Sequence, residues 1–312
     1  MIIGIFIPIL LGVLFCIVLG ANNASVCFGT NVGAGFVKYS MAAGSAAIGV
    51  ILGSILEGPK LSKAISHGIL SGISLEATLV IVITTLIMIG IATIFHLPLS
   101  LSEGLIGSAI GIGFGSGINV NWSFTFTVLM FWIINPLFAA VLAVILYEMI
   151  ARLTYAVKNI LALNYLYGKI TLSLSFYVAY VLGANTVGLI NGIYYPFMGN
   201  RLIVAVVFGT ATALGMYFLS RGITESVSKE IIGLSSSTAL SAQLSGALTV
   251  HLFTQFGLPV SITQALVGAI LGIGFAKKVA FINVLKVRKI MAGWILAPPI
   301  GALISYLIII LI

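Results

Sequence analysis

Apolar runs separated by short polar connections make up most of this 312-residue chain. They are rich in Leu, Ile, Ala and Gly and do not alternate with a period of two, so they predict helices and not strands. About 20 apolar residues in a helix span the hydrocarbon core of a bilayer. The clearest runs lie at residues 2–21, 40–56, 72–95 and 124–146. The pattern therefore predicts an all-helical membrane protein that crosses the bilayer many times.

One polar-to-apolar motif occurs twice. Residues 97–115 read LPLSLSEGLIGSAIGIGFG, and residues 258–276 read LPVSITQALVGAILGIGFA. In each copy Leu-Pro precedes a Ser, and the Ser is followed three residues later by Glu or Gln, which is the spacing of a helix capping box. Each copy is therefore predicted to begin a helix, with Ser100 and Ser261 as the N-caps.

Two further motifs repeat in the same order. The sequence VLGAN occurs at residues 18–22 and again at 181–185, and WIINP at 132–136 returns as WILAP at 294–298. With the capping-box motif, the offsets are 163, 161 and 162 residues. Three blocks in one order at a nearly constant offset indicate a duplicated unit. Internal duplication is typical of secondary transporters, whose substrate site lies between the repeats near the middle of the membrane.

The duplication divides the chain into two predicted transmembrane repeats. They comprise residues 1–150 and 171–312, and a basic linker, residues 151–170, joins them. The repeats are inverted relative to each other if each crosses the membrane an odd number of times. The expected number is odd if residues 97–115 span the bilayer and even if they fold back as a re-entrant hairpin. Hydropathy does not decide, because residues 23–36 are equally ambiguous.

Composition and charge agree with a membrane protein. Only 6% of the residues are charged, against about a quarter in soluble domains. The formal net charge is +8, and the basic residues are scattered through short connections, as expected for loops that face a cytoplasm. They do not cluster with aromatic residues, so no nucleic-acid surface is predicted. We expect a multi-pass protein of the cytoplasmic membrane.

Polar residues beside the two predicted helix starts are candidates for substrate binding. A helix N-terminus has free N–H groups and a partial positive charge, so two such ends within a membrane protein predict an anion site. Hydroxyl and amide side chains there can hold an oxyanion without a fixed cation. The candidates are Ser100, Ser102, Ser261, Thr263 and Gln264. Ordinary N-capping accounts for the first Ser of each copy but not for Ser102 and Thr263.

The Gly-Ala-Asn motifs add Asn22 and Asn185 to the candidates. Gly costs about 1 kcal/mol in a helix relative to Ala, and Asn prefers caps and turns, so each motif is predicted to break its helix. Broken helices at membrane depth are tolerated where they line a cavity or are buried in protein. The alternative is a packing interface of small residues.

Acidic residues are few, and their placement is informative. The chain has no Asp, and of its six Glu only Glu103 lies in a repeated motif. Glu103 has two compatible predicted roles: it completes a capping box, or it carries a proton, as carboxylates within membranes often do. His67, His96 and His251 have no carboxylate or Cys at ligand spacing, so no metal or other cofactor is predicted.

Two other classes of protein are weighed against a transporter. An enzyme is not expected, because the sequence has no nucleotide-binding or peptidase motif and no activated nucleophile. An anion channel shares the helix-terminus sites of a transporter, but it needs a continuous pore. Saturable counterflow distinguishes the two, because a channel has no carrier step.

These motifs resemble those of the inorganic phosphate transporter family, which includes phosphate permeases and a branch of sulfate permeases. The resemblance covers nearly the whole chain and is carried by Gly20-Ala21-Asn22, Phe28-Gly29-Thr30, Leu97-Pro98-Leu99-Ser100, Gly183-Ala184-Asn185, residues 257–268 and residues 294–299. It implies inverted repeats, a homodimer, and an anion site between two hairpins and the Gly-Ala-Asn motifs. It places the substrate contacts at Ser100, Ser102, Ser261 and Thr263.

The sequence departs from this family at positions that bear on coupling. Phosphate members typically have an aspartate after each Asn of the Gly-Ala-Asn motifs, and these aspartates look like sodium ligands. Asn23 and Thr186 stand there instead. This departure argues against sodium as the coupling ion and favours a proton. The predicted coupling residues are Glu103, Asn23 and Thr186. Phosphate is the more frequent substrate in this family, so we expect phosphate. Sulfate is the alternative, because Ser102-Glu103 is more similar to the sulfate branch.

Overall fold

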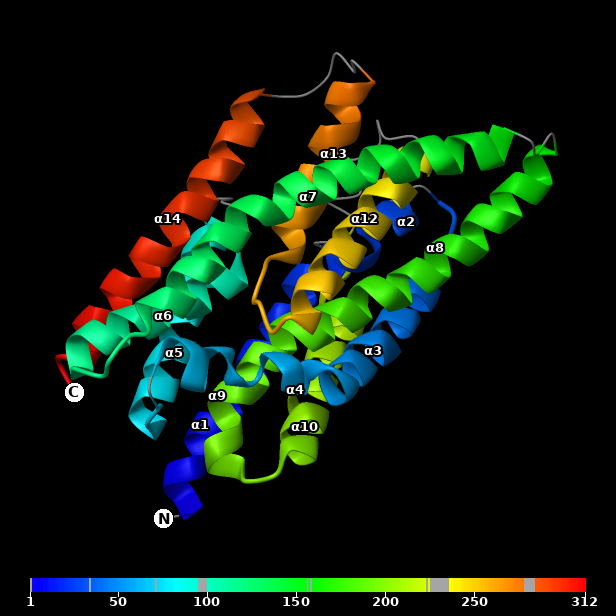
Figure 1. The fold of residues 1–312 in the computed structure, drawn as a ribbon. Helices are drawn as coiled ribbons and strands as arrows, with labels where there is room; N and C mark the ends of the chain where they lie inside the picture. The colour runs from blue at the N-terminus through cyan, green and yellow to red at the C-terminus, as the bar shows by residue number, and fades with distance from the viewer. Residues whose placement is uncertain are drawn as a thin grey trace.

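The computed structural model describes residues 2–33, 35–70, 72–94, 100–155, 157, 159–222, 224, 236–277 and 284–312. Helices make up the regular structure of these residues, beside one isolated β-bridge between Leu70 and Val120. The α-helices (Figure 1) are α1 Ile2–Ala24, α2 Thr30–Gly33, α3 Tyr39–Leu56, α4 Gly58–Leu61, α5 Leu75–Ile94, α6 Leu101–Ser116, α7 Trp122–Tyr155, α8 Ile160–Leu182, α9 Gly188–Met198, α10 Arg201–Leu214, α12 Ser236–Gln255, α13 Ile262–Ala276 and α14 Val284–Ile309. Short π-helical segments are η1 Ser25–Gly29, η2 Ala64–Ile69, η3 Gly183–Val187 and η4 Gly215–Leu219.

Six helical stretches among the described residues are long and apolar enough to cross a membrane. Three lie in each half of the chain: Phe6–Gly33, Tyr39–Leu56 and Trp122–Tyr155, then Leu161–Met198, Arg201–Leu219 and Val287–Ile309. Between the second and third stretch of each half lies a pair of packed helices, α5 with α6 and α12 with α13. We call these pairs the first and second hairpin.

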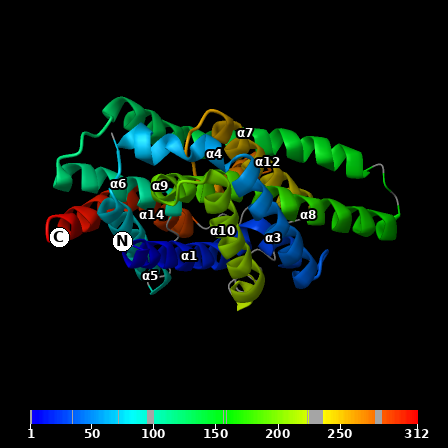
Figure 2. The ribbon, with the colours of Figure 1, turned by 90° about the horizontal axis from the view of Figure 1, so that it is seen from below.

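The two halves interlock instead of forming separate bundles. The second helix of each hairpin packs along the last helix of the other half, α6 on α14 and α13 on α7. The first two spanning helices of each half also pack across the halves: α1 packs on α10, and α3 packs on α8. Seen from below, helices from the two halves therefore alternate across the molecule (Figure 2).

Glycines permit the closest of these helix contacts. A Cβ atom at Gly107 of α6 would lie 2.4 Å from the carbonyl oxygen of Pro298, and one at Gly268 of α13 would lie 2.3 Å from that of Pro136. Both distances are too short for any side chain. The repeated Gly and Pro positions of the sequence are thus equivalent contacts between the halves.

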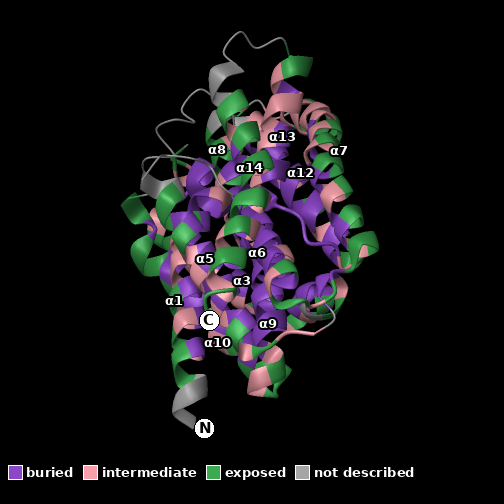
Figure 3. Ribbon diagram, turned by 90° about the vertical axis from the view of Figure 1, so that its left-hand side faces the viewer, coloured by how far each residue is buried: buried purple, intermediate pink, exposed green. Residues whose placement is uncertain are grey.

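Burial follows this arrangement. Buried residues concentrate along α6, α12 and α13, whereas large apolar side chains of α7 and α14 are exposed on the outside (Figure 3). An apolar exterior is expected where lipid replaces water as the solvent. The hairpins therefore occupy the interior of the protein.

One sequence prediction about helix ends is wrong. The Gly-Ala-Asn motifs do not break their helices: α1 continues into η1 and α2, and α8 continues through η3 into α9. A π-helical turn begins three residues after the first motif and contains the second, and the chain stays helical through both. The predicted linker, residues 151–170, is also largely helical, because α7 extends to Tyr155 and α8 begins at Ile160.

The count of membrane crossings also differs from the sequence expectation. With the hairpins left out, each half has three candidate spans and not an even number. The reason is that the predicted run 72–95 forms α5, which belongs to the first hairpin and is not one of the long candidate spans. Most of residues 23–36, which hydropathy left ambiguous, extend the first helix through η1 and α2.

Candidate functional site

The two copies of the capping-box motif meet in the centre of the protein. Gln264 Nε2 of α13 donates a hydrogen bond to Glu103 Oε1 of α6. These residues occupy equivalent positions in the two copies, and both are almost completely buried, with 2% and 1% of their surface exposed. The contact places the beginnings of the two inner hairpin helices side by side.

The capping prediction holds for one copy only. Ser261 is the N-cap of α13, and its side chain accepts from the backbone N–H of Gln264 at 3.3 Å. Ser100 stands at the N-cap position of α6, but its hydroxyl makes no capping bond. Glu103 bonds Gln264 instead of completing a capping box. The first copy therefore keeps a free hydroxyl where the second uses it in the fold.

Several polar atoms at this place have no hydrogen-bond partner among the described residues. Buried polar groups in proteins are normally paired, so each unpaired one needs an explanation. The atoms are Ser100 Oγ, Glu103 Oε2, Gln264 Oε1 and Asn185 Oδ1, and all four residues are at most 3% exposed. At the paired helix starts, the Ser100 hydroxyl can donate, and the Glu103 and Gln264 oxygens can accept, a hydrogen bond from a polar ligand; Asn185 offers one further acceptor at η3.

The Gly-Ala-Asn motifs lie differently in the two halves. Asn185 in η3 is buried and donates from Nδ2 to Thr254 Oγ1 of α12 at 2.9 Å, so it reaches the second hairpin. Asn22 is exposed, and neighbouring Asn23 is buried but donates to the carbonyl of Leu19 in its own helix at 3.1 Å. Asn185 therefore joins the candidate site through a contact, and Asn22 does not.

The remaining candidates are placed by their helices. Ser102 and Thr186 are buried, at 2% and 4% exposure, and Thr263 is partly exposed. Ser102 and Thr263 lie two residues after the N-cap residues of α6 and α13, and η1 packs against α13. His96 and residues 97–99 lie outside the described residues.

Sequence reasoning missed how the last helix of the first half holds the second hairpin. Trp132 Nε1 donates to the carbonyl of Pro259 at 3.0 Å, and Asn135 Nδ2 donates to the carbonyl of Ser261 at 2.9 Å. Both residues belong to the repeated WIINP motif, so the repeat was a signal for them. In the second copy Ala297 replaces the Asn, which makes the two hairpins unequal.

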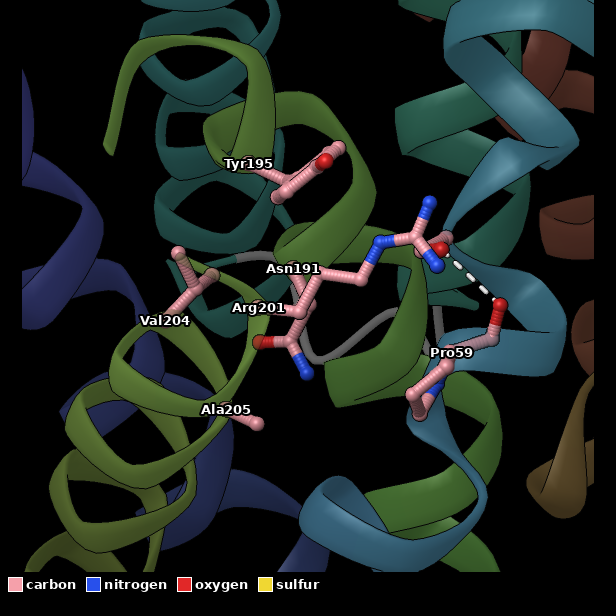
Figure 4. A pocket seen from close by; sticks show the side chains of 7 residues that line it. Pro59, Asn191, Tyr195, Arg201, Val204 and Ala205 are labelled. Carbon is pink, nitrogen blue, oxygen red and sulfur yellow. Dashed lines mark hydrogen bonds between the residues drawn. The ribbon is translucent and has the colours of Figure 1, made fainter. Parts of the chain in front are cut away.

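One small pocket lies apart from the hairpin site. Side chains of α4, α9 and α10 line it: Pro59, Ser62, Asn191, Tyr195, Arg201, Val204 and Ala205 (Figure 4). The Arg201 guanidinium lies 4.7 Å from the centre of the Tyr195 ring. None of the residues expected to bind substrate is part of this pocket.

Comparison with known proteins gives one family over most of the chain. The model of the phosphate transporter family matches residues 19–305. A protein of Methanocaldococcus jannaschii named as a candidate phosphate permease is 31% identical over 307 residues, covering 98% of this chain and 97% of the relative. The sulfate permease CysP of Bacillus subtilis is 28% identical over 311 residues, covering 96% of this chain and 86% of the relative.

The fold also matches a solved structure. A protein described as the sodium-dependent phosphate transporter superimposes with a TM-score of 0.84 and covers 99% of this chain and 98% of its own. The two sequences are 23% identical. At this identity the match establishes the shared fold.

Proposed function

Because the chain belongs to the phosphate transporter family, we propose that it is a secondary active transporter that carries inorganic phosphate across the cytoplasmic membrane. The family consists of transporters and not of enzymes, and the chain is a multi-pass membrane protein. The hydrogen bond between Glu103 and Gln264 is the observation that supports the site most directly. It joins equivalent positions of the two repeats, where duplicated transporters bind their substrates.

The unpaired atoms at the site favour phosphate over sulfate. Sulfate is a dianion without a proton, whereas phosphate carries at least one P–OH group at neutral pH and can donate a hydrogen bond. Asn185 Oδ1 and Gln264 Oε1 are buried acceptors without a partner among the described residues. A site that leaves such acceptors unpaired discriminates against a ligand that cannot donate. Sulfate remains the alternative, because a relative that aligns with nearly the whole chain is named a sulfate permease.

The coupling ion in this proposal is a proton. The chain has no Asp, and its one buried carboxylate at the site, Glu103, has an oxygen without a hydrogen-bond partner among the described residues. Asn23 and Thr186 at the ends of the Gly-Ala-Asn motifs offer only neutral oxygens to a cation. The solved relative is described as sodium-dependent, so sodium is the alternative that the assay must test.

The proposal includes inverted repeats in a homodimer. Three candidate spans per half give each half an odd number of crossings, so the halves run in opposite directions through the membrane if both hairpins turn back within it. The reciprocal contacts of α6 with α14 and α13 with α7 support this symmetry.

Counterflow in liposomes tests this function. Purified protein is reconstituted with unlabelled phosphate or sulfate inside, and entry of labelled anion is followed against protein-free liposomes. We expect saturable phosphate counterflow and net uptake driven by an inward proton gradient without sodium. Accumulation of neither anion contradicts the function, exclusive sulfate counterflow selects the alternative, and a sodium requirement that protons cannot replace contradicts proton coupling.

A further inference from the structure

A second cluster of titratable side chains lies outside the hairpin site, where the end of α3 meets the end of α12. His251 Nε2 is 2.9 Å from Glu57 Oε2, and His251 Nδ1 is 2.8 Å from the hydroxyl oxygen of Tyr177. Glu57 follows α3, Tyr177 belongs to α8 and His251 to α12. The cluster therefore ties the first half of the chain to a helix of the second hairpin.

The positions of the protons follow from the chemistry of the three groups. A carboxylate only accepts hydrogen bonds, so His251 Nε2 carries a hydrogen and donates it to Glu57. In the neutral imidazole Nδ1 is an acceptor, and the Tyr177 hydroxyl donates to it. In the imidazolium Nδ1 also donates, and the hydroxyl turns to accept. His251 can thus take up a proton from water at Nδ1 and keep both hydrogen bonds without movement of heavy atoms.

The neighbouring groups keep Glu57 ionised. Gln255 Nε2 donates to Glu57 Oε2 at 2.7 Å, and Lys60 Nζ lies 3.4 Å from the same oxygen. Partial burial raises the pKa of Glu57, but hydrogen bonds from Gln255 and His251 outweigh it and hold the pKa below its ordinary value. Tyr180, which also hydrogen-bonds Glu57, completes the groups that face this carboxylate.

Water can reach this cluster, in contrast to the hairpin site. The side chains of His251 and Glu57 are 25% and 19% exposed, and that of Lys60 is 40% exposed. An exposed ammonium group avoids hydrocarbon, so the open side of the cluster faces water or headgroups. Protons can therefore exchange at His251 without passing Glu103, which is 1% exposed.

The cluster is one helical turn from a contact of the candidate site. His251 and Thr254 both belong to the last turns of α12, and Thr254 Oγ1 accepts from Asn185. The loop of the second hairpin follows directly, and a Cβ at Gly257 would lie 3.4 Å from the carbonyl oxygen of Lys60. A change in charge at His251 therefore acts on the end of α12 where Asn185 and this loop are held.

Glu57 lies between α3 and α4, and α9 holds the end of α3 in place. Asn191 Nδ2 of α9 donates to Ser54 Oγ of α3 at 3.0 Å. In the turn that follows Glu57, Ser62 Oγ donates to the carbonyl of Pro59 at 2.8 Å, the dashed line in Figure 4. The end of α3, which Glu57 follows, is therefore tied to α9.

We propose that His251, with Glu57 and Tyr177 as its partners, is a proton-binding site separate from Glu103, and that its protonation changes the rate at which the second hairpin moves during transport. The first part, the proton site, stands independently of the substrate. The second part rests on the proposed function as a transporter.

Nuclear magnetic resonance tests the proton site without any transport. The protein is labelled with ¹⁵N-histidine and studied in detergent, and His251→Gln assigns the signals of this residue among the three histidines. We expect the ring nitrogens of His251 to change from the neutral to the protonated pattern as the pH is lowered. Tyr177→Phe should alter the Nδ1 signal and Glu57→Gln the titration, with the His67 signals unchanged. A ring that stays in one state, or that ignores both substitutions, contradicts the site.

Counterflow tests the effect on transport. The pH is kept equal on both sides, so that no gradient drives the reaction, and wild type, His251→Gln and the control His67→Gln are compared. We expect the ratio of rates at about pH 5.5 and pH 8 to differ at least about fivefold between wild type and His251→Gln, the lower end of typical coupling between sites. His67→Gln should behave as wild type.

The outcomes separate the two proposals. A pH profile that is the same in wild type and His251→Gln contradicts the role of His251 in transport. Absence of counterflow in the wild type contradicts the proposed function, and the magnetic resonance experiment then still decides whether the proton site exists. If His251→Gln does not purify as a single species, His251→Asn, which also lacks the imidazole, replaces it in both measurements.

Discussion

Glu103 and Gln264 hold equivalent positions at the centre of the protein, but they are chemically unequal. A carboxyl group can exchange a proton and an amide cannot. The duplication brought both to the same place, and the difference between them is therefore available for coupling. In the proposed mechanism, this one carboxyl group therefore decides which ion is coupled to transport.

Replacing Glu103 by Gln should remove this difference. Glu103→Gln keeps a similar shape and a hydrogen-bonding partner for Gln264, so we expect the protein to remain folded and monodisperse. Net uptake should no longer respond to an inward proton gradient, because the pair has lost its titrating group. The control is Glu76→Gln, an exposed acid in the first turn of α5. A gradient response equal to that of wild type would leave Glu103 with a structural role only.

Ser100 and Ser261 should respond differently to the same substitution. Ser261→Ala removes a helix cap, which costs about 1 kcal/mol of stability, because its hydroxyl accepts from Gln264 N–H. Ser100→Ala removes a hydroxyl without a partner among the described residues, so its thermal unfolding should match wild type while the half-saturating phosphate concentration rises. Equal losses of stability in the two variants would contradict this assignment.

At the scale of elements, the hairpins are held in the protein by different contacts. The second hairpin has two side-chain hydrogen bonds from α7, donated by Trp132 and Asn135. The corresponding helix α14 has Ala297 in place of the Asn, and the indole N–H of Trp294 has no partner among the described residues. The two hairpins thus have similar sequences, but the neighbouring spanning helix gives them different hydrogen bonds.

Asn135→Ala gives the first copy the residue that the second copy has. We expect a folded protein with slower phosphate counterflow, because the loop before Ser261 loses its anchor. The loss of a buried hydrogen bond should lower stability by about 1 kcal/mol, measured by thermal unfolding in detergent. Asn159→Ala serves as a control, because that side chain caps the exposed start of α8. Counterflow as slow in the control as in Asn135→Ala would point to general destabilisation.

At the scale of the whole molecule, close helix contacts between the halves define the fold. Each half places glycines of its inner helices against backbone atoms of the other half, as Gly107 does against Pro298 and Gly268 against Pro136. Large side chains at these positions would separate the helices. The two repeats are therefore expected to fold as one unit.

Gly107→Ala tests this interlocking. The added Cβ would lie 2.4 Å from the carbonyl oxygen of Pro298, a backbone atom that cannot turn away. We expect the variant to lose the single symmetric peak of the wild type in size-exclusion chromatography. Gly90→Ala in α5 is the control, because a Cβ there meets no atom within 4 Å. A monodisperse Gly107→Ala would show that α6 and α14 can separate without loss of the fold.

Particular residues show which features of the fold and the candidate site could be predicted from the sequence. Apolar periodicity predicted the helices, and the duplicated motifs predicted that Ser100, Glu103, Ser261 and Gln264 belong to two related helix starts. The local rules failed where tertiary contacts compete with them. Glu103 bonds Gln264 across the repeats instead of its own helix end, and the chain stays helical through both Gly-Ala-Asn motifs, with a π-helical turn at or shortly after each.

The sequence by itself determined the class of protein, the duplication and the residues of the two hairpin starts, because these depend on composition, periodicity and repeated order along the chain. Only the tertiary structure decided which copies meet. Contacts between Glu103 and Gln264, between Asn135 and Ser261, and between Glu57 and His251 join residues from opposite halves. No local pattern specifies such pairs, since they arise from the way in which the two halves interlock.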